Sequence, residues 1–543
     1  MGLIQEITQA FLRYKEKAAA SHYVPPNSLI TLTYGQLEER VKGLAQYLLK
    51  QGMQPCDLVM CYMTKSVDLV VSILAIVLNG GTCCCFYSKQ NPQYALKLFS
   101  MANPRFILLE ENTLRSVKRQ MERIEPNHPF PFYGRYPEAG GTGGSLQNHN
   151  RAIYVLKYPS VESDSDKGLQ EVDSNFDKAS WCLFTSGSTG SPKGVLISGE
   201  DLLQRAVNEI EDYEITDQDC LLSLLPFSFD VGLNQLLSCF LSGAHLIILN
   251  SWFPKDILTA VRSRNINGIS GVPSIWAEAL AYPKGPDFEQ NTQTLRYITV
   301  SGGDFSKNQL LQLRQYFRNV KIFKTYGQTE TFRSSMLKPF DFERKMTSVG
   351  RPIKGTEIRI LNEKGEIAFP NTEGEIVHYG VGTMLGYLND LEGTSEKLRK
   401  MKEPGSETMK EGKWVFTGDR GKMDEEGYLY VLGREDGMIK TLGHRVYPKE
   451  IESCILEYDH VKNAAVVGIK DERKGQIIIA EVIGNGALDK QRLIIFLKER
   501  LPYYMVPGEI NVVEYLPMTE SGKIKYTTIK ERYEERRFLQ NHS

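Results

Sequence analysis

Helical patterns alternate with short apolar runs through most of this chain, and this alternation limits the folds that it can adopt. The amphipathic stretch LISGEDLLQRAVNEIEDY, residues 196–213, precedes the apolar run DCLLSLLPFSF, residues 219–229. Another helical pattern follows, and then the apolar run AHLIILN, residues 244–250. Such alternation is typical of βαβ units, in which crossover helices connect parallel strands. It predicts an α/β protein with mainly parallel sheets.

A change of pattern near the C-terminus predicts a second domain. The chain has 543 residues, which is too long for one compact core. The segment YLYVLGREDGMIKTLGHRVYPKEIESCILEY, residues 428–458, has the pattern strand, turn, strand, turn, helix. We therefore expect a large N-terminal domain, residues 1–434, and a small α+β C-terminal domain, residues 435–543.

Charge and hydropathy argue against several classes of partner. The 65 basic and 66 acidic residues give a formal net charge of -1, which predicts no binding to nucleic acid or anionic lipid. The N-terminus has no apolar core of a signal peptide. The longest apolar run, residues 68–81, is too short to span a bilayer and predicts a buried helix. We expect a cytoplasmic protein without membrane insertion, in which the consecutive Cys83, Cys84 and Cys85 are reduced thiols of a core strand.

The densest run of small and hydroxylated residues, FTSGSTGSPKGV at 184–195, has the composition of a phosphate-binding loop. Its glycines let the backbone turn its N–H groups toward anionic oxygens, while its hydroxyls and its lysine add donors and charge. It is not a Walker loop, because Lys193 is one place off and no Ser or Thr follows it. The strand-like segments on both sides argue against a flexible linker.

This loop resembles the signature loop of the adenylate-forming superfamily, which includes acyl-CoA synthetases, peptide-synthetase adenylation domains and luciferases. Further matches follow in the order that the family has. They are TYGQTE at 325–330, FTGDRGKMDEEGYLYVLGREDGMIK at 416–440, GHRVYPKEIE at 443–452 and LPMTESGKIKY at 516–526. With TLTYGQLEERVKGLAQYL at 31–48, the resemblance covers nearly the whole chain.

The resemblance implies a reaction in two halves that uses ATP and Mg²⁺. A carboxylate attacks the α-phosphate of ATP and gives an acyl-adenylate and pyrophosphate. A thiol then takes the acyl group. Because the first half joins two anions, such a site must supply positive charge and fixed geometry.

For the nucleotide, the resemblance implies a phosphate loop followed by an adenine and ribose site. The loop at 186–194 is implied to hold the β- and γ-phosphates. The nucleotide-binding residues implied in and beside it are Thr185, Ser186, Gly187, Ser188, Thr189, Gly190 and Lys193. The other residues implied in nucleotide binding are Gly302, Thr325, Tyr326, Gly327, Thr329, Asp419, Arg434 and Lys523. Among them, Tyr326 would stack on adenine and Asp419 would accept hydrogen bonds from the ribose hydroxyls.

The catalytic residues implied by the resemblance are Lys523, Lys193 and Glu330. Lys523 would contact the substrate carboxylate, and Glu330 would bind Mg²⁺ together with Thr185. Asp436 matches the hinge about which family members rotate a mobile small domain between the half-reactions. An ordinary turn residue is the alternative for Asp436.

Asp230 is the main clue to the acyl substrate. It lies in the apolar run LPFSFDVGLNQLL, residues 225–237, where a carboxylate needs a partner. It matches the aspartate with which amino-acid-activating members hold the substrate ammonium group. Two alternatives stay open: backbone N–H groups could satisfy this carboxylate, and some acyl-CoA ligases share the FD pair.

The substrate pocket that the resemblance implies is polar. Its residues are Asp230, Val231, Asn234, Ser270, Thr299, Ser301, Arg333 and Ser334. Arg333 either fills the pocket and leaves room for a small amino acid, with glycine favoured, or pairs with an acidic side chain. The first alternative is similar to the glycine–carrier-protein ligase of lipid A modification.

The acceptor is expected to be the phosphopantetheine thiol of a separate carrier protein, or else CoA. After Lys523 the chain has only a short charged segment, residues 524–543, with no attached carrier domain. Gln328 keeps open the alternative of an acyl- or aryl-CoA ligase, because this variant is frequent in those enzymes. A catalytically inactive binding protein of the same fold is the alternative from another class.

Overall fold

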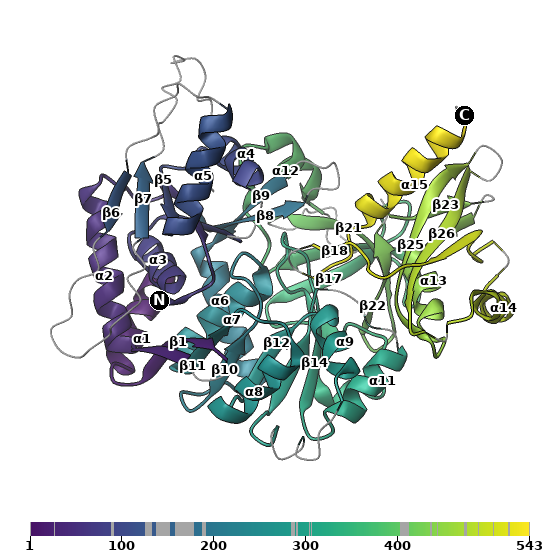
Figure 1. Ribbon diagram of the computed structural model, residues 1–543, viewed down its shortest axis with the longest axis horizontal. Helices are drawn as coiled ribbons and strands as arrows, with labels where there is room; N and C mark the ends of the chain where they lie inside the picture. Colours follow the sequence, from purple (N-terminus) through teal and green to yellow (C-terminus); the bar gives the residue numbers. More distant parts are fainter. Residues whose placement is uncertain are drawn as a thin grey trace.

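The structure is a computed structural model, shown in Figure 1. It describes residues 2–25, 28–87, 92–124, 133–136, 153–157, 179–186, 192–283, 288, 292–302, 305, 307–401, 412–434, 437–441, 444–471, 475–486, 488–502, 504–519 and 522–541.

One large sheet has the strand order β16-β15-β14-β13-β12-β10-β11-β1-β2. Its middle strands, from β14 to β1, pair in parallel, and antiparallel strands close both edges. The bounds are β1 Ala18–Val24, β2 Ser28–Thr33, β10 Cys220–Ser223, β11 His245–Leu249, β12 Gly268–Gly271, β13 Tyr297–Val300, β14 Lys321–Tyr326, β15 Ser335–Leu337 and β16 Arg351–Pro352. The ends of β13 and β14 in this sheet carry several of the residues predicted for the site.

A second large sheet has the order β19-β9-β8-β4-β3-β5-β7-β6. Strands β8, β4, β3 and β5 are parallel neighbours, and the pairs outside them are antiparallel. The bounds are β3 Leu58–Met63, β4 Thr82–Tyr87, β5 Phe106–Leu109, β6 Tyr133–Tyr136, β7 Ile153–Lys157, β8 Ala179–Ser186, β9 Pro192–Ser198 and β19 Gly386–Tyr387. The antiparallel pair β8 and β9 flanks the predicted phosphate loop.

The other strands of the described ranges form two smaller sheets. The third sheet, antiparallel, has the order β17-β18-β21-β20, with β22 on β21. The fourth has the order β24-β23-β26-β25, with β27 parallel to β26. The bounds are β17 Thr356–Leu361, β18 Gly374–Gly380, β20 Leu398–Arg399, β21 Trp414–Met423, β22 Leu429–Arg434, β23 Ile439–Thr441, β24 His444–Val446, β25 Val461–Asp471, β26 Gly475–Gly484 and β27 Glu509–Val512.

Helices cover both faces of the large sheets (Figure 1). Helices α1 Leu3–Arg13, α2 Tyr34–Lys50, α3 Val67–Leu78, α6 Gly199–Tyr213 and α7 Asp230–Ser242 contribute to one core that strands of both large sheets share. The outer helices are α4 Pro92–Ala102, α5 Glu111–Ile124, α8 Pro254–Arg264, α9 Pro273–Ala281, α11 Lys307–Tyr316 and α12 Leu391–Lys397. Helices α13 Pro448–Ile455, α14 Lys490–Arg500 and α15 Tyr526–Asn541 pack with the fourth sheet.

Local sequence signals explain the ends of α6 and α7, the two helices nearest the site. The Oγ of Ser198 caps α6 by accepting a hydrogen bond from the backbone N–H of Asp201, 3.0 Å away. Helix α7 ends at Gly243, whose φ of +79° suits a residue without a side chain. A Cβ there would also meet the ring of Tyr14.

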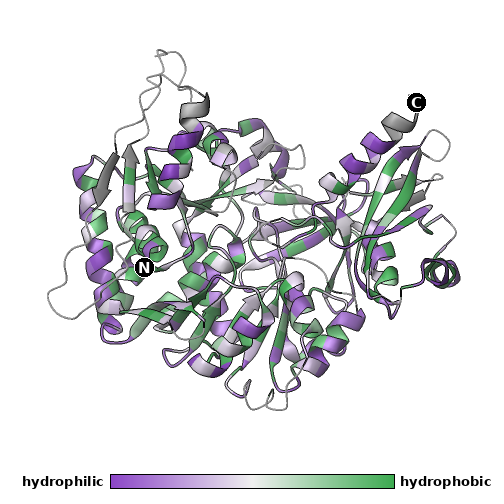
Figure 2. Ribbon diagram, viewed as in Figure 1, coloured by the Kyte–Doolittle hydropathy of each residue, from purple (hydrophilic) through white to green (hydrophobic). Residues whose placement is uncertain are grey.

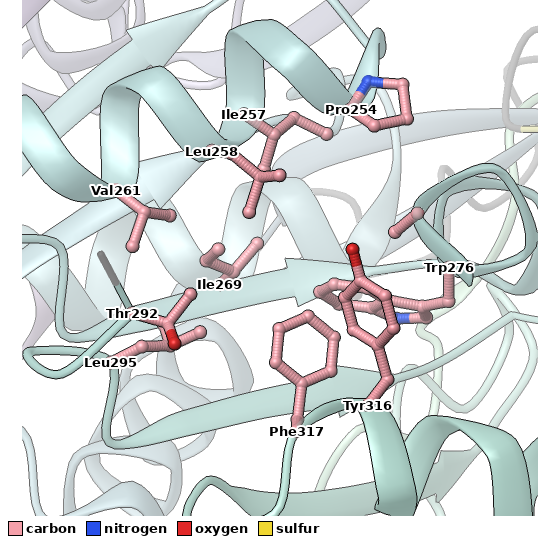
Figure 3. Close-up of a pocket in the computed structure, with 11 residues that line it drawn as sticks. Pro254, Ile257, Leu258, Val261, Ile269, Trp276, Thr292, Leu295, Tyr316 and Phe317 are labelled. Carbon is pink, nitrogen blue, oxygen red and sulfur yellow. The ribbon is translucent and has the colours of Figure 1, made fainter. Parts of the chain in front are cut away.

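The apolar residues lie where the alternating pattern predicts them, in the strands and on the inner helix faces (Figure 2). The predicted buried helix at residues 68–81 is α3, and most of its residues are buried. A small apolar cavity of about 10 Å³ lies between α8, α9 and α11, lined by Ile257, Trp276 and Phe317 among others (Figure 3). A cavity of this volume could hold about one water molecule, and its lining is apolar, so it is a packing gap of the core. None of the helices in the described ranges has both the length and the apolar character needed to cross a bilayer.

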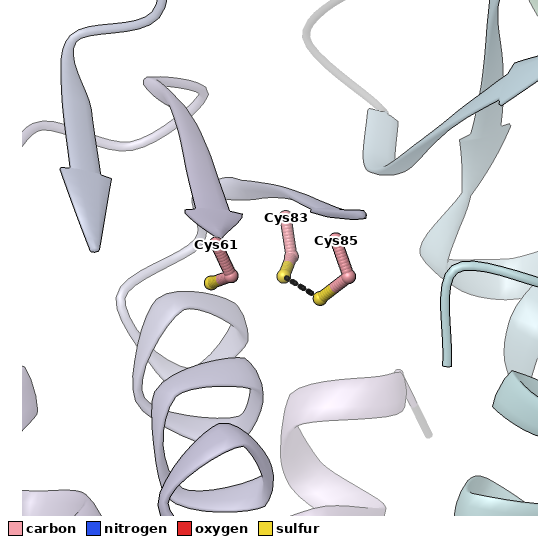
Figure 4. Close-up of side chains that lie close together, drawn as sticks. All are labelled: Cys61, Cys83 and Cys85. Carbon is pink, nitrogen blue, oxygen red and sulfur yellow. Dashed lines mark hydrogen bonds between the residues drawn. The ribbon is translucent and has the colours of Figure 1, made fainter. Parts of the chain in front are cut away.

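The three consecutive cysteines lie in β4 and are buried, free thiols, as the sequence predicts. Cys83 and Cys85 point to the same face of the sheet, with their sulfurs 3.7 Å apart, and Cys61 of β3 lies beside them (Figure 4). All three belong to the shared hydrophobic core. Burial raises the pKa of the Cys83 and Cys85 thiols, so they pack as small neutral side chains.

The predicted fold class is confirmed: a large α/β N-terminal domain is followed by a small α+β C-terminal domain. The third sheet ends with β22 at Arg434, and the fourth sheet begins with β23 at Ile439. The proposed division at 434/435 falls between these strands and stays a prediction. The proposed hinge residue, Asp436, lies outside the described residues.

Candidate active site

The two domains meet at a cavity that many of the predicted substrate and nucleotide residues line. It lies at the ends of β13 and β14, beside the start of α7, and a loop of the C-terminal domain reaches into it. Predicted substrate residues that line it are Asp230, Val231, Asn234, Ser301 and Arg333. Predicted nucleotide residues that line it are Gly302, Thr325, Tyr326, Gly327, Thr329 and Lys523. Segments that are nearly 300 residues apart in sequence therefore form one site.

On the nucleotide side, Asp419 of β21 is the centre of a hydrogen-bond network. Its Oδ2 accepts from the hydroxyl of Tyr326 and from Nε2 of Gln328, each at 2.7 Å. Arg434 of β22 lies with Nη1 3.7 Å from Oδ1. Burial raises the pKa of Asp419, and the charge of Arg434 opposes this rise. The network fixes the orientation of a carboxylate that can accept hydrogen bonds from ribose hydroxyls.

Glu330 and Lys193 lie around one aromatic side chain, Tyr387 of β19. The hydroxyl of Tyr387 donates to Oε1 of Glu330 at 2.8 Å. Nζ of Lys193, on β9, lies 4.7 Å from the centre of the Tyr387 ring and 3.1 Å from Oδ2 of Asp390. A cation and an oxygen ligand are thus held near each other, as a metal-bound polyphosphate requires.

A lysine that the motifs do not include also lies on this side. Nζ of Lys397, in α12, donates to the backbone carbonyls of Phe416 and Thr417 at 3.1 and 3.0 Å. Burial lowers the pKa of Lys397, and the charge of Glu330 opposes this. Lys397 therefore adds positive charge beside Glu330 and Asp419.

Lys523 reaches the cavity from a tight loop of the C-terminal domain. Its backbone N–H donates to Oγ1 of Thr519 at 2.9 Å, and its Nζ lies 5.5 Å from the centre of the Phe229 ring. Gly522, next to it, has a φ of +77°, and a Cβ there would meet Ser274 at 2.5 Å. The loop can approach the N-terminal domain this closely because that position is glycine.

Asp230 is the first residue of α7 and is buried, with 8% of its surface exposed. Its Oδ1 has no hydrogen-bond partner among the described residues. Burial raises the pKa of Asp230, and the charge of Lys523 is the largest influence that lowers it. A backbone hydrogen bond from Val231 also lowers this pKa, so backbone N–H groups satisfy the carboxylate only in part. A buried carboxylate oxygen without a partner is costly, and because Asp230 also lines the cavity, this points to a ligand with hydrogen-bond donors.

Arg333 is not free in the cavity, because the protein supplies its counter-ion. Nη2 of Arg333 lies 3.0 Å from Oε2 of Glu209 in α6, and its guanidinium lies 5.4 Å from the centre of the Tyr213 ring. Glu209 has only 1% of its surface exposed. The alternative in which Arg333 pairs with an acidic substrate therefore competes with an internal ion pair.

Some predicted residues lie elsewhere. Ser270, Thr299 and Ser334 are buried, and they do not border the cavity. Thr185 is in β8, opposite Lys193 in the pairing with β9. Ser186 ends β8, and the loop residues Gly187, Ser188, Thr189 and Gly190 lie outside the described residues.

Sequence reasoning missed the residues that support the site. Glu209 had a recognisable signal, because it occurs on the buried face of α6 with Leu202, Ala206 and Tyr213. A charged residue in such a stripe predicts a buried ion pair. Tyr387 and Lys397 had no comparable signal, since their partners are distant in sequence.

Comparisons with known proteins identify the family. The AMP-binding enzyme family matches residues 8–388, and its C-terminal domain matches residues 450–523. The chain is 30% identical over 511 residues to 2-succinylbenzoate–CoA ligase of Bacillus mycoides, covering 93% of this chain and 94% of that one. It is 27% identical over 502 residues, 92% of this chain, to bacitracin synthase 3 of Bacillus licheniformis, of which it spans 7% of the length.

A solved structure has the same fold. ATP-bound MatB from Rhodopseudomonas palustris superimposes with a TM-score of 0.79, at 22% identity, covering 98% of this chain and 99% of that chain. The family match spans most of the N-terminal domain and continues through the loop that carries Lys523. The chain therefore belongs to the AMP-binding enzyme family of the adenylate-forming superfamily and is an ATP-dependent, AMP-forming ligase.

Proposed function

We propose that this enzyme activates a small amino acid, with glycine favoured, and transfers it to the phosphopantetheine thiol of a separate carrier protein. The observation that carries the proposal is the buried carboxylate of Asp230, whose Oδ1 has no partner among the described residues. It faces the cavity that Lys523 also lines. An ammonium group supplies both the charge and the donors that this oxygen lacks.

The first half-reaction would use two oppositely charged groups of the cavity. The substrate ammonium would bind Asp230, while its carboxylate would be held near Lys523. A carboxylate oxygen attacks the α-phosphorus of ATP, the bond to the bridging oxygen breaks, and pyrophosphate leaves with that electron pair. The thiol sulfur then attacks the acyl carbon, AMP leaves, and the thiol proton is released to solvent.

The residues on the nucleotide side fit ATP and Mg²⁺. Glu330, held by Tyr387, offers a hard oxygen ligand, and Thr185 is the second candidate. The metal would offset the charge of the departing pyrophosphate. Lys193 and Lys397 would add fixed positive charge, and Asp419 would orient the ribose.

The position and the ion pair of Arg333 support a small substrate. Its long side chain borders the cavity, and its charge is already paired with Glu209. A large side chain would have to displace Arg333, and an acidic one would have to compete with Glu209. Glycine requires neither.

An acyl- or aryl-CoA ligase is the second candidate. Gln328, the residue frequent in those enzymes, donates to Asp419, and relatives such as 2-succinylbenzoate–CoA ligase are named for CoA. In that reading the partner of Asp230 would be a substrate hydroxyl or a water. A catalytically inactive binding protein is the third candidate, and the arrangement of Lys523 and Glu330 argues against it.

ATP–pyrophosphate exchange tests the proposal. The screen uses the twenty amino acids together with short fatty and aryl acids, and we expect exchange with glycine above all others. Exchange with fatty or aryl acids alone would contradict the role of Asp230. Lys523→Ala should abolish the exchange, whereas exchange with none of these acids in the wild type would favour the inactive-protein alternative. Mass spectrometry of candidate carrier proteins, and of CoA, identifies the acceptor.

A further inference from the structure

One face of helix α6 holds Arg333 in position. Arg205, Glu209 and Tyr213 follow one another at a spacing of four residues, so they lie on the same face. Glu209 pairs with the Arg333 guanidinium, and the ring of Tyr213 lies against it. Arg205 donates to the backbone carbonyl oxygen of Arg333. The helix thus contacts both the side chain and the backbone of this pocket residue.

The carboxylate of Glu209 is fully engaged by the protein. Oε2 accepts from Arg333 Nη2 at 3.0 Å and from Nδ2 of Asn234, and Oε1 accepts from Oγ of Ser238 at 3.1 Å. Asn234 and Ser238 both belong to α7, the helix that begins with Asp230. Glu209 therefore links the pocket arginine to the helix of the proposed substrate anchor.

The backbone around Arg333 is also constrained. Phe332 has a φ of +55°, an unfavourable conformation for a residue with a side chain. Arg205 donates to the carbonyl oxygen of Thr331 at 2.8 Å and also to that of Val381. A Cβ at Gly327 would overlap the carbonyl oxygen of Phe332. Because the backbone cannot move easily, the direction of the Arg333 side chain depends on Glu209.

We propose that Glu209 is a specificity-determining positioning residue, which acts on the substrate through Arg333. It holds the arginine across the acyl pocket and cancels its charge. The first effect excludes large side chains, and the second removes the attraction that an unpaired guanidinium would have for an acidic side chain. The inference rests on the proposed function, because it explains why a neutral, small amino acid is selected.

A change that removes only the charge separates these effects. In Glu209→Gln the side chain keeps its size and can still accept hydrogen bonds, but the guanidinium loses its counter-ion. An acidic substrate side chain then becomes the available anion for Arg333. The expected gain for aspartate over glycine is at least about tenfold in relative kcat/KM, in the range of close charge pairs at interfaces.

The experiment measures ATP–pyrophosphate exchange with glycine, alanine, leucine and aspartate for the wild type and Glu209→Gln. The matched control is Glu211→Gln on the same helix, where the exposed Glu211 pairs with Lys354 at 2.7 Å. In the control the aspartate-to-glycine ratio should stay within about twofold of the wild type, as for an exposed ion pair. A ratio of two substrates on one enzyme does not change when only the folded fraction falls. An unchanged ratio in Glu209→Gln would overturn the proposal.

The double variant Glu209→Gln/Arg333→Ala tests whether the arginine limits the size of the substrate side chain. It also provides a second test if the single variant does not fold. It removes both buried charges and the long side chain, so alanine and leucine should gain at least about tenfold over glycine, while aspartate should not. An unchanged preference for glycine in this variant would overturn the role of the pair. If the wild type activates no amino acid, the proposed function has failed. The inference is then tested with the acids that do support exchange, by comparing acetate with malonate.

Discussion

Two buried carboxylates on neighbouring helices, Glu209 of α6 and Asp230 of α7, have opposite surroundings. Glu209 has an arginine, an amide and a hydroxyl as partners, all from the protein. Asp230 has an oxygen without a partner among the described residues and faces the cavity. The protein alone satisfies the carboxylate of Glu209, whereas in the proposed function the substrate ammonium completes the partners of Asp230. In the proposed function, hydrogen-bond satisfaction, more than burial, distinguishes the structural carboxylate of Glu209 from the substrate-binding carboxylate of Asp230.

The largest expected effect is a loss of folding stability when the ion pair between Glu209 and Arg333 is broken. Glu209→Ala leaves the guanidinium of Arg333 buried without a counter-ion and also leaves a cavity. Losing one member of a buried ion pair costs about 3–5 kcal/mol of folding free energy. Thermal and denaturant unfolding measure this cost, with Glu211→Ala on the same helix as control. A loss no larger than that of the control would show that the pair contributes little to stability.

Removing the carboxylate of Asp230, which has an unpartnered oxygen, should instead affect substrate binding. Asp230→Asn keeps the shape of the side chain but loses its charge. The kcat/KM for amino-acid-dependent exchange should fall by an amount that corresponds to about 2–5 kcal/mol of transition-state stabilisation. The unfolding temperature of the unliganded protein should stay the same or rise, because a carboxylate with an unpartnered oxygen is removed. Comparable losses of stability in Asp230→Asn and Glu209→Ala would end the distinction between the two carboxylates.

The same distinction predicts a pH dependence of smaller size. Burial raises the pKa of Asp230 above the value of about 3.9 that it has in the unfolded chain. Below that value both states are protonated, so the difference in unfolding temperature between the wild type and Asp230→Asn should be smallest and independent of pH. As pH rises through the raised pKa, the unfolded chain loses its proton first, so the wild type becomes less stable relative to the variant. The difference should then stay constant, and saturating glycine should reduce it in the wild type.

The smallest effect is expected for a carboxylate of a third kind, which is paired but partly exposed. Asp390 lies 3.1 Å from Nζ of Lys193, and about a third of its side chain is accessible. Asp390→Asn should release Lys193 for phosphate and change the KM for ATP by less than about fivefold, because such pairs contribute roughly 0–1 kcal/mol. A change of a hundredfold would place Asp390 with the essential carboxylates. Initial rates at varied ATP measure the KM.

Much of the fold followed from local patterns. The alternation of amphipathic and apolar stretches predicted the parallel strands and their helices, since βαβ connection leaves few other arrangements. The motif residues Tyr326, Asp419 and Lys523 were recognisable because each lies in a short run with a specific composition. The structure brings Tyr326 and Asp419 within hydrogen-bond distance, and it directs Lys523 into the same cavity.

Other features were hidden because contacts across a sheet or between helices leave no local pattern. Ser270, Thr299 and Ser334 were expected in the pocket, but they are buried and do not border it. Matching positions by order along the chain does not tell which face of a strand points to the ligand. Cys61 joins Cys83 and Cys85 only because β3 and β4 are neighbours. Lys397 is near the nucleotide side because α12 packs beside β21.

The sequence by itself determined the family and predicted the order of the domains and the residues that would meet ATP, because motifs keep the chemistry of a reaction in short contiguous runs. Only the tertiary structure decided what Arg333 does. The sequence left two readings, a guanidinium that fills the pocket or one that awaits an acidic substrate. Its counter-ion, Glu209, lies 124 residues earlier in the chain. The charge of a side chain is written in the sequence, but whether that charge is available to a ligand depends on what the fold places against it.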